Sequence, residues 1–143
     1  LSERAVKLAQ ENVRLNFGDD APHEAIATNA VEYLKDIDDS YDLIILDPPA
    51  FAKHHKVLGN ALQGYKKINA RALQKIRPGG ILFTFSCSHA VSRDLFRTTI
   101  FTSAAIAKRK VRIIGQLTQP ADHPINIYHP EGEYLKGLVV YVE

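Results

Sequence analysis

The amino-acid sequence predicts a doubly wound α/β fold. Helical patterns alternate along the chain with short apolar runs, which is the order expected when strands are joined by helices. The 143 residues fit one domain, and 45% of them are hydrophobic, enough for a substantial core. The chain starts on a helical pattern and contains no glycine-rich loop of the G-x-G-x-x-G or G-x-x-x-x-G-K type. We therefore expect a sheet truncated at its amino-terminal side, with the first two strands missing.

The first part of the chain predicts a helix, a strand and a second helix. Residues 2–16 have an amphipathic pattern that Ser2 would cap and Gly18 would end. Residues 25–28 form a short apolar run typical of a strand. Asn29 then opens a brief helix that reaches Leu34.

The second part alternates strand and helix. The unbroken apolar run 43–46 predicts a strand buried on both faces of a parallel sheet, and Asp47 stands at its carboxyl end. The last strand is expected to be antiparallel. The other elements follow in order: a helix over 58–76, a turn at 78–80, a strand over 81–85, a helix from Ser92 to about Arg109, and strands over 111–117, 125–128 and 138–142.

Two strand ends carry reactive side chains. Asp47 follows one predicted strand, and Cys87, between Ser86 and Ser88, follows another. Taken alone, Asp47 is more typical of a carboxylate that caps loop amides, and Cys87 is more typical of a small buried residue, than of a functional group. Because neighbouring parallel strands end at the same edge of a sheet, the two together favour a functional site.

Composition narrows the function classes. The single cysteine excludes an internal disulfide and a zinc cluster, and His54 and His55 lack a third ligand, so no metal site is expected. No apolar run could span a bilayer and no secretory pattern opens the chain, so we expect a cytoplasmic protein with no membrane partner. The net charge of +2 permits an anionic partner.

Basic residues gather in several places. Lys66 and Lys67 and the loop 53–56 after Asp47 could follow a phosphate backbone. The cluster 108–112 lies where a helix ends. For this cluster we favour a favourable interaction with the helix dipole over binding to a phosphate backbone.

Six motifs in order give a resemblance: D-P-P-A-F, Q-G-Y-K-K-I-N, R-P-G-G, F-S-C-S-H, A-D-H-P and E-Y-L-K-G. With them the chain resembles, over its whole length, the bacterial class I methyltransferases that modify 23S ribosomal RNA. The subgroup it most resembles makes 5-methylcytosine, because S-C-S follows the P-G-G strand. The resemblance implies that residues 1–143 form a partial catalytic domain with a Rossmann-like sheet. It also implies S-adenosylmethionine as the cofactor and ribosomal RNA as the partner.

The resemblance also implies roles for residues. Cys87 matches the nucleophile that adds to cytosine C6, and Asp47 matches the acid that hydrogen-bonds the base. The positions expected on the substrate side are Pro49, Phe51, Lys53, Tyr65, Lys66, Ser86 and Ser88. Ala50 stands where some cytosine-C5 RNA methyltransferases have a second cysteine, so assistance to product release would come from elsewhere.

Cofactor contacts are expected from Asn29 and Ala30, together with Asp47 and Pro48. Asn29 replaces the usual acid, and its amide oxygen could accept from the adenine amino group or serve as an ordinary helix cap. Because the glycine-rich loop is not among these residues, we expect the chain as given to hold half of the cofactor site and to bind S-adenosylmethionine weakly.

Other functions stay open at this stage. The D-P-P loop would also suit a methyltransferase of exocyclic amino groups in which Cys87 is merely packed. A non-catalytic RNA-binding domain could keep the same fold, and an exposed sheet edge would favour a homodimer. A hydrolase triad of Asp122 and His123 with Asp47 or Ser86 is disfavoured, since no G-x-S-x-G elbow is present.

Overall fold

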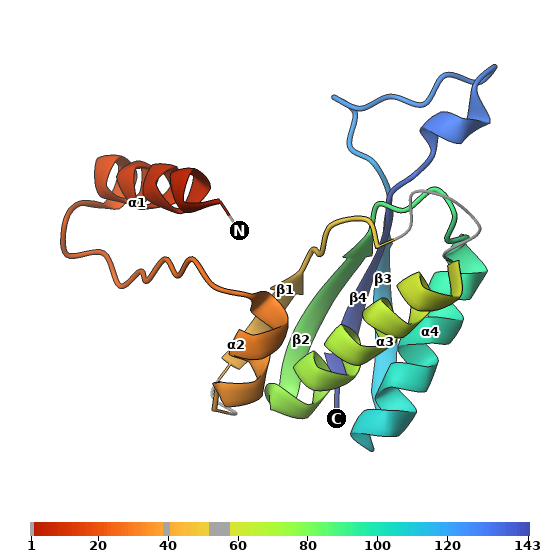
Figure 1. Cartoon of the computed structure of the whole chain (residues 1–143), viewed down its shortest axis with the longest axis horizontal. Coiled ribbons are helices and arrows are strands. Elements are labelled where there is room, and N and C mark those ends of the chain that lie inside the picture. Colours follow the sequence, from red (N-terminus) through yellow and green to blue (C-terminus); the bar gives the residue numbers. More distant parts are fainter. Residues whose placement is uncertain (1, 39–40, 52–57) are drawn as a thin grey trace. The chain divides into compact units, whose positions relative to one another are not determined.

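The computed structural model describes residues 2–38, 41–51 and 58–143. The chain divides into two compact units, one ending at Asp36 and the other spanning Ile37–Glu143 (Figure 1). Each unit is described by itself.

The first unit contains helices α1 (Glu3–Phe17) and α2 (Ala30–Asp36). The Ser2 hydroxyl accepts a hydrogen bond from the Ala5 amide at 3.2 Å, which confirms the predicted cap of α1. The strand predicted over residues 25–28 is wrong, because these residues are irregular. A short apolar run becomes a strand only when it pairs, and the described part of this unit contains no other strand.

The second unit is built on a four-stranded mixed sheet. Its strands are β1 (Tyr41–Leu46), β2 (Ile76–Ser86), β3 (Val111–Leu117) and β4 (Lys136–Val142), in the order β1-β2-β4-β3. β1 and β2 are parallel, whereas β4 is antiparallel to both of its neighbours. The predicted parallel neighbours and the antiparallel last strand are confirmed.

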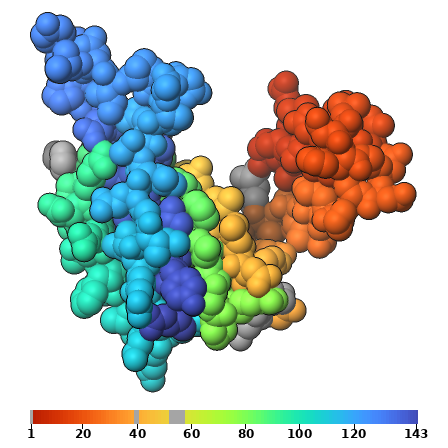
Figure 2. All heavy atoms as spheres, turned by 180° about the vertical axis from the view of Figure 1, so that it is seen from behind, coloured from red at the N-terminus to blue at the C-terminus, as the bar shows by residue number. Residues whose placement is uncertain are grey.

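Helices α3 (Leu58–Lys75) and α4 (Arg93–Ala107) pack against each other and cover one face of this sheet (Figure 1). The Ser92 hydroxyl caps α4 by accepting from the Leu95 amide at 3.2 Å, as predicted. Figure 2 shows the opposite face, where the strands lie side by side. A doubly wound sheet has helices on both faces. Within Ile37–Glu143, however, the described helices α3 and α4 both lie on the same face.

β1 is less buried than the sequence predicts. Leu46 is 6% exposed, but Leu43 and Ile45, on the opposite face, are 48% and 65% exposed. β1 is an edge strand of the described sheet, and none of the helices described in its own unit covers this face. The prediction of a strand buried on both faces is therefore wrong for this unit.

The predicted turn at residues 78–80 lies inside β2 as an irregularity. Tyr41 pairs with Ile76 and Leu43 with Ile81, so β2 uses three more residues than β1 between these two pairs. Gly79 has φ of 82°, and a Cβ on Gly80 would lie 2.7 Å from the Ile76 side chain. The two glycines let the chain bulge here without leaving the sheet.

Between β3 and β4 the chain forms an arm, residues 118–135, which extends beyond the sheet (Figure 1). The strand predicted over 125–128 is wrong, since this exposed segment is irregular and ends in a turn, followed by the short 3₁₀ helix Pro130–Gly132. At the other end of the sheet, the Arg109 guanidinium donates to the Ile76 carbonyl at 3.0 Å, which supports a structural role for the 108–112 cluster. In the described ranges, no helix combines the length and apolar character needed to cross a membrane.

Candidate active site

Asp47 and Cys87 lie at the same edge of the sheet, as expected from the parallel pairing of β1 with β2. The last pair between the two strands joins Leu46 of β1 to Thr84 of β2, so the segments that follow the two strands begin next to each other. A pocket of about 590 Å³ opens there. Its walls come from the two strand ends and from the arm: Asp47, Pro48, Pro49, Cys87, Gln119, Pro120, His123, Tyr134 and Leu135.

The loop after β1 is anchored by its apolar residues. Pro48 is buried, whereas Asp47 is exposed. The Phe51 ring meets the Tyr65 ring edge-on, with centroids 4.8 Å apart. A Cβ on Gly64 would lie 3.2 Å from the Phe51 ring, so the glycine in Q-G-Y allows this close approach. The carboxylate is thus carried on a segment that Phe51 fixes to α3.

The loop after β2 is fixed by hydrogen bonds on both sides of Cys87. Ser86 and Ser88 are 0% and 1% exposed. The Ser88 amide donates to the Ser86 hydroxyl at 3.4 Å, and the Ser88 carbonyl accepts from the Val91 amide at 3.2 Å. Cys87 itself is half-buried and lines the pocket. This arrangement presents a single thiol from a rigid turn.

Beneath the pocket, α3 is tied to β2 by buried polar groups. Asn69 is fully buried, accepts from the Thr84 hydroxyl at 2.6 Å and donates to the Tyr65 carbonyl at 2.9 Å. The Tyr65 hydroxyl is buried without a hydrogen-bond partner among the described residues. Burial raises the pKa of Tyr65, while the nearby Ser86 side chain and Phe51 backbone lower it less.

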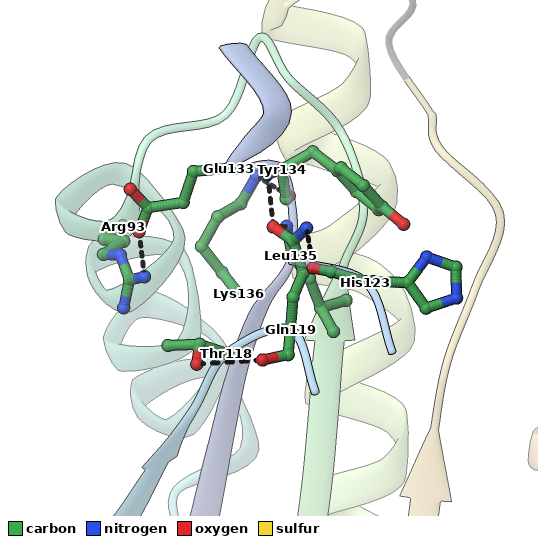
Figure 3. A network of polar contacts seen from close by, with 8 residues as sticks. All are labelled: Arg93, Thr118, Gln119, His123, Glu133, Tyr134, Leu135 and Lys136. Atoms are coloured by element: carbon green, nitrogen blue, oxygen red, sulfur yellow. Dashed lines mark hydrogen bonds and ion pairs between the residues drawn. The ribbon is translucent and has the colours of Figure 1, made fainter. Parts of the chain in front are cut away.

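The arm closes one side of the pocket through Gln119 (Figure 3). Its side-chain oxygen accepts from the Tyr134 amide at 2.9 Å and the Leu135 amide at 3.4 Å. Its side-chain nitrogen donates to the His123 carbonyl at 3.3 Å. One amide therefore joins both ends of the arm beside the pocket, and Figure 3 shows the His123 ring extending away from this network.

The pocket residues of the arm were not predicted as site residues. They are Gln119, Pro120, His123, Tyr134 and Leu135. Four of them fall in or beside A-D-H-P and E-Y-L-K-G, two of the motifs that carry the resemblance, and His123 also belongs to the disfavoured hydrolase triad. The hydrolase interpretation lacks an exposed hydroxyl, because Ser86 is fully buried.

Several predicted site residues lie elsewhere. Tyr65, like Ser86 and Ser88, is buried and presents no side chain to solvent. Lys66 lines a separate groove of about 430 Å³ with Lys67 and Arg71. Lys53, His54 and His55 lie outside the described residues. Within the described part of the chain, no three His, Cys, Asp or Glu side chains are grouped as metal ligands would be.

Asn29 and Ala30 belong to the first unit. The Asn29 side-chain oxygen accepts from the Val31 amide at 3.0 Å, and its carbonyl accepts from the Tyr33 amide at 2.9 Å. The helix-cap interpretation of Asn29 is therefore confirmed. The cofactor contacts of Asn29 and Ala30 stay predictions.

A mixed α/β sheet whose adjacent parallel strand ends present an acid and a thiol to one pocket has the architecture of an α/β enzyme. Residues 1–114 match the model of the methyltransferase small domain, and the chain belongs to this family.

Curated relatives and solved structures agree with this membership. A protein of Shewanella denitrificans named ribosomal RNA large subunit methyltransferase I is 42% identical over 145 residues, which cover 99% of this chain and 36% of that protein. A relative of the same name from Cronobacter sakazakii is 40% identical over 144 residues, with 99% and 36% covered. The chain thus spans about a third of the length of these relatives.

Two solved structures share the fold at low sequence identity. One is a protein of Streptococcus mutans proposed to be a SAM-dependent methyltransferase, with a TM-score of 0.79 and 21% identity, covering 99% of this chain and 36% of that one. The other is a proposed methyltransferase complexed with SAH, with a TM-score of 0.79 and 22% identity, covering 99% and 37%. At this identity the likeness establishes the α/β fold.

Proposed function

We propose that the protein containing this chain is an S-adenosylmethionine-dependent methyltransferase of large-subunit ribosomal RNA. The family match over residues 1–114 and the relatives at 42% and 40% identity support this assignment. A ribosomal RNA substrate would place the protein in the cytoplasm. The methylated atom is, in our proposal, C5 of a cytosine.

The observation that carries the cytosine assignment is the shared pocket of Asp47 and Cys87. C5 of cytosine is a weak nucleophile, so an enzyme that methylates it needs a thiolate to add at C6 first. Methylation of an exocyclic amine needs no thiol. A half-buried Cys87 on a rigid turn, facing the same space as a carboxylate, suits the first chemistry.

The residues present fit part of a cofactor site. Asp47 and Pro48 line a pocket of about 590 Å³, within the range of small-ligand sites. The Asn29 side-chain oxygen already accepts from the Val31 amide, but an amide oxygen has a second lone pair for the adenine amino group. Bound S-adenosylmethionine would supply an electrophilic methyl group. We propose that residues 1–143 hold half of this site, because the family's glycine-rich loop is not among them.

In the proposed reaction, the Cys87 thiolate forms a bond to C6 of the cytosine, and the electron pair of the C5–C6 double bond moves to C5, where it would form the bond to the methyl group. Bound S-adenosylmethionine would supply that group and would keep the electron pair of the broken S–CH3 bond. The C5 proton then leaves to a base, the S–C6 bond breaks, and the thiolate is restored. The Asp47 carboxylate would accept a hydrogen bond from the cytosine amino group and hold the base against the sulfur. His123, which lines the same pocket, is the candidate base.

The other predicted residues would shape the substrate side. Pro49 lines the pocket and could contact the base directly, whereas buried Tyr65 would act through Phe51. Lys66, in its basic groove, would follow the phosphate backbone of RNA whose target base is splayed out. A homodimer through the β1 edge stays a prediction, which light scattering after size exclusion would check.

Replacing Cys87 by Ala in the full-length protein tests the chemistry. Methyl transfer to ribosomal RNA should fall by about 10³-fold or more, because the covalent step is lost. RNA carrying 5-fluorocytosine at the target has no C5 proton to release, so the unsubstituted enzyme should form a protein–RNA adduct that survives denaturation. The C87A variant should form none, and RNA with ordinary cytosine is the control.

Two outcomes would contradict this proposal. Near-normal turnover by C87A would favour methylation of an exocyclic amine through the D-P-P loop. Salt-dependent RNA binding without methyl transfer by the unsubstituted full-length protein would favour a non-catalytic RNA-binding domain.

A further inference from the structure

Lys136, the first residue of β4, is a lysine built into the core. It is 6% exposed. Its ammonium donates to the Ser88 carbonyl at 2.5 Å and to the Tyr134 carbonyl at 2.6 Å. Figure 3 shows the side chain extending to Tyr134 beside the arm network. One ammonium thus joins the residue that follows Cys87 to a wall of the pocket.

A buried ammonium is costly without a compensating anion. Both acceptors of Lys136 are neutral carbonyls, and among the described residues no carboxylate forms an ion pair with it. The neighbouring Glu133 carboxylate is paired with Arg93 instead. Among the described residues, the buried ammonium is therefore held by two carbonyl dipoles and not by an ion pair.

The electrostatic surroundings of Lys136 include the thiol. Burial lowers the pKa of Lys136 most, and Cys87 opposes this shift more strongly than Glu133 does. Arg93 adds to the lowering. The ammonium, which is bound to the carbonyl of the residue after Cys87, therefore places a positive charge beside the sulfur.

We propose that Lys136 is a positioning residue for Cys87: its ammonium holds the S-C-S turn against the arm and places a positive charge beside the sulfur. This inference rests on the proposed function for its role in methyl transfer. The electrostatic coupling between the ammonium and the sulfur does not rest on that function, and it can be measured without RNA or cofactor.

Cys87 is the only cysteine of the chain, so the rate at which thiol reagents modify the chain reports on Cys87 alone. The rates of modification by an anionic and a cationic methanethiosulfonate reagent would be compared on the folded chain and on the chain unfolded in urea. Near a fixed cation, the anionic reagent gains over the cationic one. We expect the anionic-to-cationic rate ratio to be at least about threefold higher in the folded chain.

Two variants separate the effect of the Lys136 charge from the effect of its hydrogen bonds. Lys136→Met removes both the charge and the donors, whereas Lys136→Gln keeps a donor group without charge. Both should lower the rate ratio by about threefold or more. Lys67→Met is the matched control, since it removes one exposed positive charge from α3 and should leave the ratio unchanged. Circular dichroism would show which variants are folded.

A wild-type ratio equal in folded and unfolded chains would overturn the proposal, even if neither variant folds. A folded K136Q variant with the wild-type ratio would also overturn it, because a tether alone would then explain Lys136. In the full-length enzyme, K136Q should lower kcat more than it raises KM. If the rate ratio falls as expected but C87A keeps normal methyl transfer, the coupling stands and the proposed function fails.

Discussion

The carboxyl ends of β1 and β2 lie side by side, but the functional side chain at the β1 end is exposed, whereas the one at the β2 end lies between two buried serines. On either side of Cys87, Ser86 and Ser88 are 0% and 1% exposed and hydrogen-bonded. Asp47 is exposed, and β1 pairs only with β2 among the described strands. Among the described residues, the β1 loop is held by the packing of Phe51 on Tyr65, and no hydrogen bond to the Asp47 carboxylate is found there.

This difference suggests a division of roles. A nucleophile gains from a fixed position, because small displacements of the attacking atom cost rate. A carboxylate that meets an incoming base must stay open to solvent until the base arrives. Substitutions at the β1 end should therefore change activity with little effect on stability, and substitutions beneath the β2 end should change stability first.

At the β1 end, the largest effect is expected from Asp47. In the full-length enzyme, D47N should lower kcat/KM for RNA methylation by about 10²-fold or more, because the base loses its acceptor and its orientation. The free energy of unfolding should stay within about 0.5 kcal/mol of the wild type, since the side chain is exposed. Steady-state methyl transfer and urea unfolding measure the two quantities.

The matched control for D47N is Asp42→Asn. Asp42 is an exposed carboxylate on the same strand, paired with Arg77 at 2.9 Å. This variant should keep full activity. Equal losses in D42N and D47N would mean that the effect belongs to the strand and not to the pocket.

The sequence predicted the part of the site that depends on neighbouring strands. The apolar runs before Asp47 and Cys87 are typical of buried parallel strands, so their ends were expected at one edge of the sheet. The exposure of Ile45 was not foreseen, because an apolar run does not reveal which face of a strand lacks a helix.

The arm could not be predicted as part of the pocket. Gln119 reaches Tyr134 across a loop whose course depends on tertiary contacts, and no periodic pattern marks such a loop. Lys136 was missed for another reason: a lysine in a sequence is read as a surface residue, since lysines are rarely fully buried. Only the structure supplies its two carbonyl acceptors.

A smaller effect, on stability, is expected beneath the β2 end. Asn69→Ala removes the acceptor of the buried Thr84 hydroxyl and the donor to the Tyr65 carbonyl. The free energy of unfolding should fall by about 2–3 kcal/mol, because a buried polar group is left without a partner. Urea unfolding of the chain measures this loss. Gln63→Ala, an exposed amide on the same helix, should cost much less, and similar losses in both variants would argue against a special role of the buried pair.

The smallest effect is expected at Tyr65, which lies between the two strand ends. Its hydroxyl is buried without a partner among the described residues, so Tyr65→Phe should change the free energy of unfolding by less than about 1 kcal/mol at pH 7. Burial raises the pKa of Tyr65. Above the unfolded value near 10, the unfolded chain therefore loses this proton while the folded chain keeps it, and stability falls as pH rises.

The Y65F variant lacks this linkage, so between about pH 9 and 11 it should lose less stability than the wild type. Tyr128→Phe is the control, because Tyr128 is 86% exposed and should leave the alkaline slope unchanged. Urea unfolding at several pH values gives the slopes. Identical slopes for Y65F and the wild type would mean that the phenol ionises in the folded chain as readily as in the unfolded one, which would contradict the effect of its burial between the two strand ends.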